Sequence, residues 1–310
     1  MRFHTVMFKT LDDLFRIKRS LLFIIAVLIV PIIISGLLNS VLGLSTMSLA
    51  NQIQTVTMFY IIIVFFWVAG IPLVLLAGVT CGDFISKEEN EGTLLLLVSK
   101  PVGRHEIVLG KYFAFLINIL ILEIIAVTLS ALIMYWILPI DPAVLDSMTG
   151  LIPAIIFYAM FIAVTFGALA TALSCIFKSR FKTIMILVVI TMAVFLGFMA
   201  FRGFMSDAGI YDPYIVWADV NYHMGNSYLS FIDSTGYRMA PTLQATLGMF
   251  TGTYSAADPS MLFDVDIGAM YPSIPRNDYV SPLLSLFGWF IFTIALLVFG
   301  IMRFQRREIK

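Results

Sequence analysis

The chain has 310 residues, of which 60% are hydrophobic and 12% are charged, and its formal net charge is zero. Soluble domains are about half apolar and about a quarter charged, so this composition excludes an ordinary soluble protein and indicates a membrane protein. The zero net charge argues against a nucleic-acid partner. The two cysteines, Cys81 and Cys175, are too few for a disulfide framework, and we interpret them as free thiols.

Charge-free stretches define the membrane spans in chain order. A bilayer core needs about 20 apolar residues per helix. No charged residue occurs between Ser20 and Gly82, a length that fits two spans. The later apolar stretches, 112–140, 147–177, 183–201 and 279–302, hold one charge, Glu123. The sequence therefore predicts an all-α membrane protein with six transmembrane helices, over residues 20–41, 57–81, 106–138, 150–177, 183–202 and 281–302.

Lysine and arginine indicate the orientation of these spans. The N-terminal segment, the second and fourth loops and the C-terminal tail together hold 16 of the 19 basic residues. The other three, Arg202, Arg238 and Arg276, fall on the opposite side. Cytoplasmic loops carry such an excess of basic residues. We therefore expect both termini in the cytoplasm and the chain in the plasma membrane of a prokaryote.

Two segments outside the spans have patterns of their own. In residues 1–19, apolar residues recur at three- and four-residue spacing among basic ones. This spacing predicts an amphipathic interfacial helix, although a helical stem of the first span fits equally well. Residues 203–280 hold five prolines and most of the tyrosines, a composition too aromatic for disorder. Within a single 1–310 transmembrane domain, they predict an extracytoplasmic element with short helices over 221–232 and 239–250, packed on the last two spans.

The loop between the second and third spans carries the longest motif. From Gly82 to Lys111 it reads G-D-F-I-S-K-E-E-N-E-G-T-L-L-L-L-V-S-K-P-V-G-R-H-E-I-V-L-G-K. Its pattern predicts a cytoplasmic helix broken at Gly92, with Phe84 anchored in the interface and Glu88 facing water. The apolar run Leu94–Val98 is too short to span a membrane and must be buried. An ordinary loop with a solvated charge run is the alternative interpretation.

This motif resembles the coupling segment of ABC-type exporter permeases of the second ABC exporter class, the drug, sodium and copper-maturation type. The resemblance implies that residues 83–101 dock onto a separate ATPase. It implies a half-transporter, in which two permease copies, or one copy and a paralogue, lie in membrane lipid on two cytoplasmic ATPase subunits that use ATP and Mg²⁺. The residues that it assigns to ATPase coupling are Asp83, Phe84, Glu88, Gly92, Thr93, Pro101 and Arg104.

The chain itself shows no catalytic motif, so we expect it to be no enzyme and to bind no cofactor. Its nearest approach to a phosphate-binding loop is Gly103, Gly110 and Lys111. Six residues separate the glycines where four are needed, and Tyr112 stands where Ser or Thr is required. The three histidines are scattered, and no Cys–His spacing predicts a metal site.

Two features inside the spans leave alternatives open. Glu123 costs several kcal/mol in lipid unless it is paired. It is either a proton or cation site on a transport path, or a protonated carboxyl hydrogen-bonded to a neighbouring helix or a second subunit. Small residues at four-residue spacing on the fourth span allow close helix contact, within one subunit or between two. They are Ala159, Ala163, Gly167 and Thr171.

Three functions fit these features. The first is the permease of an ABC exporter, which requires the 83–101 segment. The second is an ATP-independent transporter or channel that uses Glu123 and needs no ATPase. The third is a membrane anchor or sensor whose 203–280 element binds an external partner. The substrate is open in each case, because apolar helix faces suit lipids, drugs and peptides alike.

Overall fold

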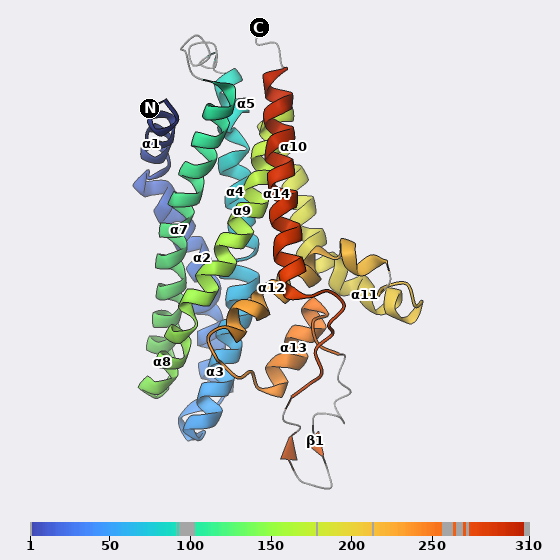
Figure 1. The fold of residues 1–310 in the computed structure, drawn as a ribbon. Coiled ribbons are helices and arrows are strands. Elements are labelled where there is room, and N and C mark those ends of the chain that lie inside the picture. The colour runs from blue at the N-terminus through green and yellow to red at the C-terminus, as the bar shows by residue number, and fades with distance from the viewer. Residues whose placement is uncertain are drawn as a thin grey trace.

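A computed structural model describes residues 2–90, 92, 103–177, 179–212, 214–255, 263–264, 269–270 and 273–306. Within these residues, six helical stretches are long and apolar enough to cross a membrane, which confirms the predicted all-α membrane fold. They are Ile17–Val41, Leu49–Glu89, Arg104–Ile137, Pro142–Ile176, Arg180–Ser206 and Pro282–Gln305. Figure 1 shows the first and last helices meeting the same end of the bundle, as an even number of crossings requires.

The second span starts at Leu49 rather than near residue 57, and it is segmented. It consists of α3 (Leu49–Ile63), the π turn η2 (Val64–Val68), α4 (Ile71–Cys81) and α5 (Asp83–Asn90). Gly70 follows the π turn, and a Cβ atom there would lie 2.4 Å from the carbonyl oxygens of Phe65 and Phe66. The break therefore needs glycine, because no other residue leaves room for the two carbonyls.

The fifth span is interrupted in the same way. It consists of α10 (Arg180–Met192), the π turn η3 (Ala193–Gly197) and α11 (Phe198–Asp207). The two π turns meet in an aromatic cluster, where the Phe65 and Phe195 rings lie 6.3 Å apart and Phe65 stacks on Tyr158 at 5.4 Å. Tyr228 completes the cluster, 5.2 Å from the Phe65 ring, and donates its hydroxyl to the Ile61 carbonyl at 3.0 Å. The cluster thus joins the second, fourth and fifth spans.

The third and fourth spans form the centre of the bundle with α4 (Figure 1). They are α7 (Arg104–Ile137), α8 (Pro142–Gly150) and α9 (Ile152–Ile176). The spans differ in how far the chain itself buries them. In an apolar stretch of 18 residues, 61% of the fourth span is buried, against 17% of the sixth span, α14 (Pro282–Gln305). The first span, α2 (Ile17–Val41), and the fifth are also mostly exposed. These three outer spans therefore turn most of their apolar surface away from the chain.

The N-terminal helix α1 (Arg2–Leu14) packs along the beginning of α7. The Val6 side chain lies 3.2 Å from where a Cβ atom on Gly110 would stand, and the rings of Phe3 and Phe113 are 5.9 Å apart. A short break at Phe15 and Arg16 then leads into α2. The predicted helix is present, and its position in the lipid interface stays a prediction.

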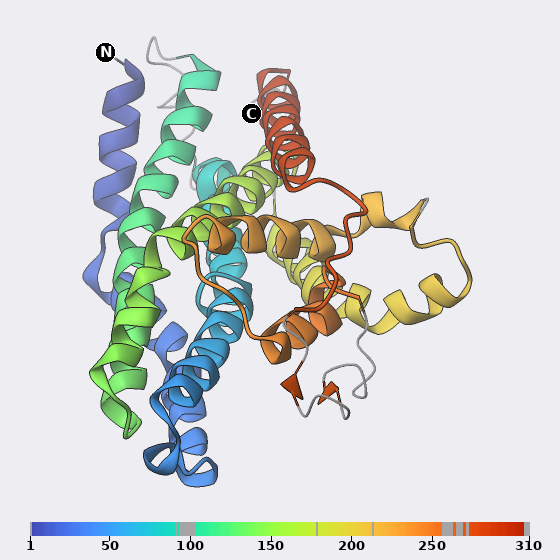
Figure 2. The same cartoon turned by 60° about the horizontal axis from the view of Figure 1, so that its bottom comes forward.

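The described part of the segment between the fifth and sixth spans contains two short helices, close to the predicted ranges. They are α12 (Val220–Asp233) and α13 (Pro241–Thr251), and they accompany the 3-10 turn η4 (Ile215–Ala218) and the antiparallel pair β1 (Phe263–Asp264) and β2 (Ala269–Met270). Figure 2 shows α12 lying crosswise to the long helices. Every residue from Asn221 to Leu229 is buried, because α12 packs against both α9 and α14. We call residues 203–280 the external element below, after their predicted position.

Candidate functional site

The segment predicted to couple to an ATPase begins with α5, which continues α4 after a break at Gly82. A Cβ atom on Gly82 would lie 3.1 Å from the methyl carbon of Thr183 in α10, so glycine lets the two spans approach closely. The Ser86 hydroxyl donates to the Gly82 carbonyl at 2.7 Å across the break. The direction in which α5 leaves the bundle is therefore set by local contacts.

Lys111 of α7 holds α5 in place through two polar contacts. Its buried ammonium lies 2.5 Å from a carboxylate oxygen of Glu88 and donates to the Phe84 carbonyl at 2.7 Å. A buried cation needs a counter-charge and hydrogen-bond acceptors, and α5 supplies both. The expectation that Glu88 faces water is therefore wrong: its side chain is 21% exposed and turned toward Lys111. Phe84 is likewise buried.

Two further contacts tie α5 to other spans. The Ile85 amide donates to the Ser174 hydroxyl of α9 at 3.0 Å. Asp83, in the first turn of α5, pairs with Arg180 at the start of α10, with Oδ1 3.0 Å from Nε. A carboxylate also suits this position because the N-terminus of a helix carries partial positive charge. The helix α5 is thus joined to the third, fourth and fifth spans by a separate contact each.

Arg104 makes the matching contact to the sixth span. At the start of α7 it donates to the carbonyls of Phe304 and Gln305, at 2.8 and 2.9 Å, and its guanidinium lies 5.5 Å from the centre of the Phe304 ring. These carbonyls end α14, where the helix carries partial negative charge, so a cation is favoured there. Arg104 therefore fastens the last span to the loop that leads out of the coupling segment.

Gly92 is the predicted coupling residue that faces outward. It is exposed, its φ is +72°, and no heavy atom of the described residues lies within 4 Å of the position of a Cβ atom. Lys87 is also exposed on α5. Thr93, Pro101 and the apolar run Leu94–Val98 lie outside the described residues.

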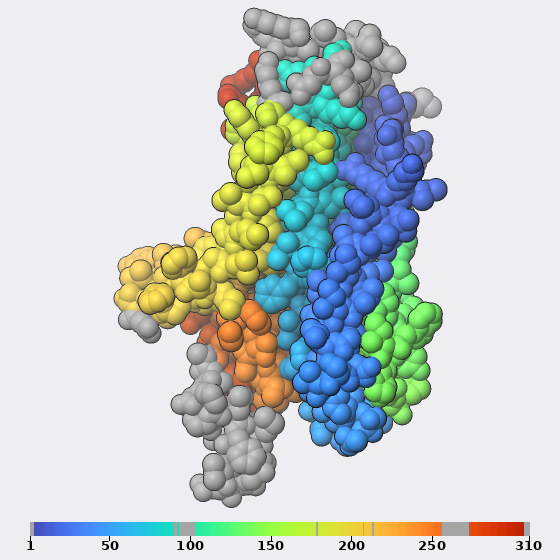
Figure 3. All heavy atoms as spheres, turned by 180° about the vertical axis from the view of Figure 1, so that it is seen from behind, coloured from blue at the N-terminus to red at the C-terminus, as the bar shows by residue number. Residues whose placement is uncertain are grey.

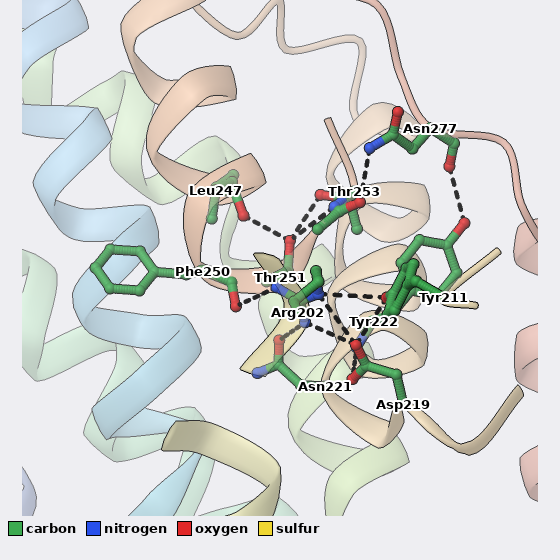
Figure 4. Close-up of polar contacts among 11 residues, drawn as sticks. Arg202, Tyr211, Asp219, Asn221, Tyr222, Leu247, Phe250, Thr251, Thr253 and Asn277 are labelled. Carbon is green, nitrogen blue, oxygen red and sulfur yellow. Dashed lines mark hydrogen bonds and ion pairs between the residues drawn. The ribbon is translucent and has the colours of Figure 1, made fainter. Parts of the chain in front are cut away.

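A second polar site lies at the opposite end of the bundle, where sequence reasoning proposed none. Arg202 of α11 is about nine-tenths buried and pairs with the fully buried Asp219, with Nη2 2.8 Å and Nε 3.1 Å from Oδ2 (Figure 4). The Tyr211 hydroxyl and the Tyr222 amide also donate to Asp219, at 2.8 and 2.9 Å. Arg202 donates further to the Asn221 side chain. We call these five residues the Arg202 cluster.

The Arg202 cluster fastens the external element to the fifth span. Arg202 also donates to the Phe250 carbonyl of α13 at 3.2 Å. Gly252, with a φ of +71°, lets the guanidinium approach, because a Cβ atom there would lie 2.6 Å from Nε. Burial, and then the neighbouring Asp219, raise the pKa of Tyr211, so its hydroxyl stays protonated and donates. The sequence signal was faint: an arginine at the outer end of a span, followed by an Asp-rich segment.

The comparison with known families bears on the whole chain rather than on one motif. The sequence model of the ABC-2 family transporter proteins matches residues 11–309. The chain belongs to the ABC-2 transporter family. No curated protein matches it. It is therefore a multi-pass ABC-2 permease, the membrane component of a transporter that works with an ABC ATPase.

The small residues of the fourth span lie inside this ABC-2 permease. Ala159, Ala163, Gly167 and Thr171 are all buried. A Cβ atom on Gly167 would lie 2.6 Å from the Phe115 ring of α7, and the Tyr112 hydroxyl donates to the Val164 carbonyl at 2.7 Å. The stripe thus meets the third span of the same chain.

Glu123 of the permease is fully buried in the middle of α7. Within the described residues, neither of its carboxyl oxygens has a hydrogen-bond partner, so the predicted bond to a neighbouring helix is not found there. A carboxylate in such a position is strongly disfavoured, and the neutral acid is the favoured form. In the described part of the chain, no three His, Cys, Asp or Glu side chains gather where they could hold a metal ion.

Replacing Glu123 is expected to leave the permease folded. Glu123→Gln should keep assembly and most transport-linked ATPase activity, because a neutral amide has nearly the shape of a protonated carboxyl. Glu123→Leu should raise stability by about 1 kcal/mol, because it removes two buried oxygens that lack partners. Thermal unfolding in detergent and transport in vesicles measure the two effects. Normal assembly with abolished transport would instead assign Glu123 to an ion path.

Proposed function

We propose that this permease is half of an ATP-driven exporter in a prokaryotic plasma membrane. Two copies form the translocation path, and each receives the movement of a separate ATPase subunit at α5. The excess of basic residues near the α5 end supports a cytoplasmic position for that end, where the ATPase and its ATP are found. The similarity of the 82–111 motif to coupling segments of exporters supports both the site of contact and the direction of transport.

The observation that carries this proposal is the set of contacts that join α5 to three of the spans. A force applied to α5 acts on the third span through Lys111, on the fourth through Ser174 and on the fifth through Arg180. A solvated loop would have no such contacts. Because helices in a packed bundle move as rigid bodies, a small displacement of α5 shifts several spans together.

The coupling residues divide into two roles on this proposal. Gly92, exposed and without a side chain, lies on the surface that the ATPase covers. Glu88, Phe84 and Asp83 face the permease and hold α5 in place. The docking surface is thus narrower than the motif, and most of the motif transmits movement instead of contacting the ATPase.

Gly92→Leu is expected to abolish ATPase binding without unfolding the permease. Leucine would meet no heavy atom of the described residues within 4 Å of its Cβ atom, but it would project into the surface that the ATPase covers. The matched control is Gly236→Leu at the opposite end, where φ is +76° and no heavy atom lies within 4 Å of an added Cβ atom. Both variants carry the same strain of a positive φ.

Co-purification of the permease with its partner ABC ATPase measures the effect. Gly92→Leu should lose the ATPase, and Gly236→Leu should retain it, at equal membrane levels of the two variants. If both variants retain the ATPase equally and transport is unchanged, Gly92 does not lie on the docking surface and the proposed coupling is refuted.

A further inference from the structure

A lateral arm projects from the outer half of the fifth span. It comprises α11, η4 and the loop between them, residues 198–212 and 214–218. Figures 1 and 3 both show it reaching sideways, away from the long helices, on the far side of η3 from α5 but short of the end of the bundle that α3 and α8 reach. The arm therefore leaves the bundle near the level where the fifth span ends.

Large apolar side chains of the lateral arm are exposed. Phe201 and Phe204 of α11 are 58% and 76% exposed. On the returning segment, Tyr214 and Trp217 are 73% and 60% exposed. Aromatic rings of this kind are enriched where the acyl chains of a bilayer meet the lipid headgroups, because one part of the ring is apolar and tyrosine and tryptophan also carry a polar group.

The exposed face of α11 continues the outer face of the fifth span. Val189, Met192 and Leu196 are exposed at steps of three and four residues, the spacing of one α-helix face. Phe201 follows after five residues, and Phe204 three residues later. The five-residue step begins at Leu196 inside η3, and a π turn holds more residues than an α turn, so the stripe keeps its face through the bend.

The opposite side of α11 is fixed. Arg202 lies between Phe201 and Phe204 in the sequence but is buried, and the Arg202 cluster holds it. Tyr211 and Val216 form a small core of their own with Tyr222 of α12. The orientation of the arm is therefore set by buried contacts, and its aromatic side is left facing outward.

We propose that the lateral arm lies in the lipid–water interface of the leaflet opposite α5, with Phe201 and Phe204 among the acyl chains. The partner of this surface is lipid, because the stripe that reaches it belongs to a membrane-crossing helix and continues without a polar interruption on that face. A helix that lies in the interface and exposes aromatic residues to the acyl chains has the expected chemistry. The arm thereby fixes the depth of the external element relative to the bilayer, independently of how the permease meets its ATPase.

Spin-label accessibility in lipid nanodiscs tests this placement on the full chain. The background is Cys81→Ala with Cys175→Ala, which removes the two buried free thiols. A nitroxide is attached at Phe204→Cys, with Phe201→Cys as a second position on the same face. The controls are Val189→Cys, on the exposed face of the fifth span, and Ser234→Cys, on an exposed turn of the external element.

The label at residue 204 should collide with oxygen far more often than with a water-soluble nickel chelate, as at residue 189. The label at residue 234 should show the reverse preference. A label at 204 that behaves like the one at 234 would place the arm in water and overturn the proposal. Protection from both reagents, with dipolar broadening between two labels, would also overturn it, because it would place a second copy of the chain on the arm.

Discussion

Arg202→Met is expected to destabilise the external element by about 3–5 kcal/mol, the usual effect of breaking a buried ion pair. The variant leaves the Asp219 carboxylate fully buried, with the Tyr211 hydroxyl and the Tyr222 amide as its remaining donors among the described residues. The spans themselves should still assemble, since the packing of α4, α7, α9 and α10 on one another does not involve the Arg202 cluster. Limited proteolysis from the side opposite α5 should therefore cut the external element much faster than in the wild type.

Two further variants test whether the loss of stability comes from the unpaired buried charge of Asp219. Arg238→Met removes an exposed arginine of the same element and should change stability by less than about 0.5 kcal/mol. Arg202→Met combined with Asp219→Leu should recover much of the loss, because no uncompensated charge remains buried. If the external element is cut no faster in Arg202→Met than in Arg238→Met, the Arg202 cluster does not hold it.

Lys111→Met is expected to uncouple transport from ATP hydrolysis. It removes the cation that holds Glu88 and the Phe84 carbonyl, a loss of about 3 kcal/mol at the base of α5. The exposed Gly92 is untouched, so the ATPase should still bind. The expected result is a complex of normal composition whose ATP hydrolysis no longer drives transport.

The charge-reversed pair gives the sharper test of this contact. Glu88→Lys alone should uncouple as strongly as Lys111→Met, because two cations would then meet at a largely buried position. Glu88→Lys with Lys111→Glu should restore part of the coupling. Lys182→Met, which changes an exposed lysine of α10, should have no effect. Normal ATP-driven transport by Lys111→Met would show that α5 acts without this ion pair.

The six spans could be predicted because charge is excluded from the bilayer core over about 20 residues at a time, and this constraint is local in the sequence. The ordered external element followed from its aromatic content. The π turns could not be predicted. A π turn inserts one residue into an apolar helix without changing its charge or its mean hydropathy, so the pattern around Phe65 and Phe195 looks like uninterrupted helix.

The candidate site was predicted as a segment but not as a set of contacts. The sequence pattern predicts a solvated Glu88 because its neighbours in the sequence are charged, whereas its partner Lys111 lies near the start of the next span. Arg202 and Asp219 are likewise brought together by the bend at η3 and by the position of α12. In both pairs the burial of one charge depends on a partner from another element, and single-sequence patterns do not report such pairings.

The two adjoining π turns allow local rotation within the second and fifth spans, which the unbroken third span does not allow. Each turn holds one residue more than the α turn it replaces. Moving that extra residue by one position exchanges the hydrogen bonds of a single turn and rotates the one residue that it passes by about 100°. The side chain presented next to each π turn can therefore change, while α11 stays held by the Arg202 cluster and α4 and α10 stay held by the contacts around α5.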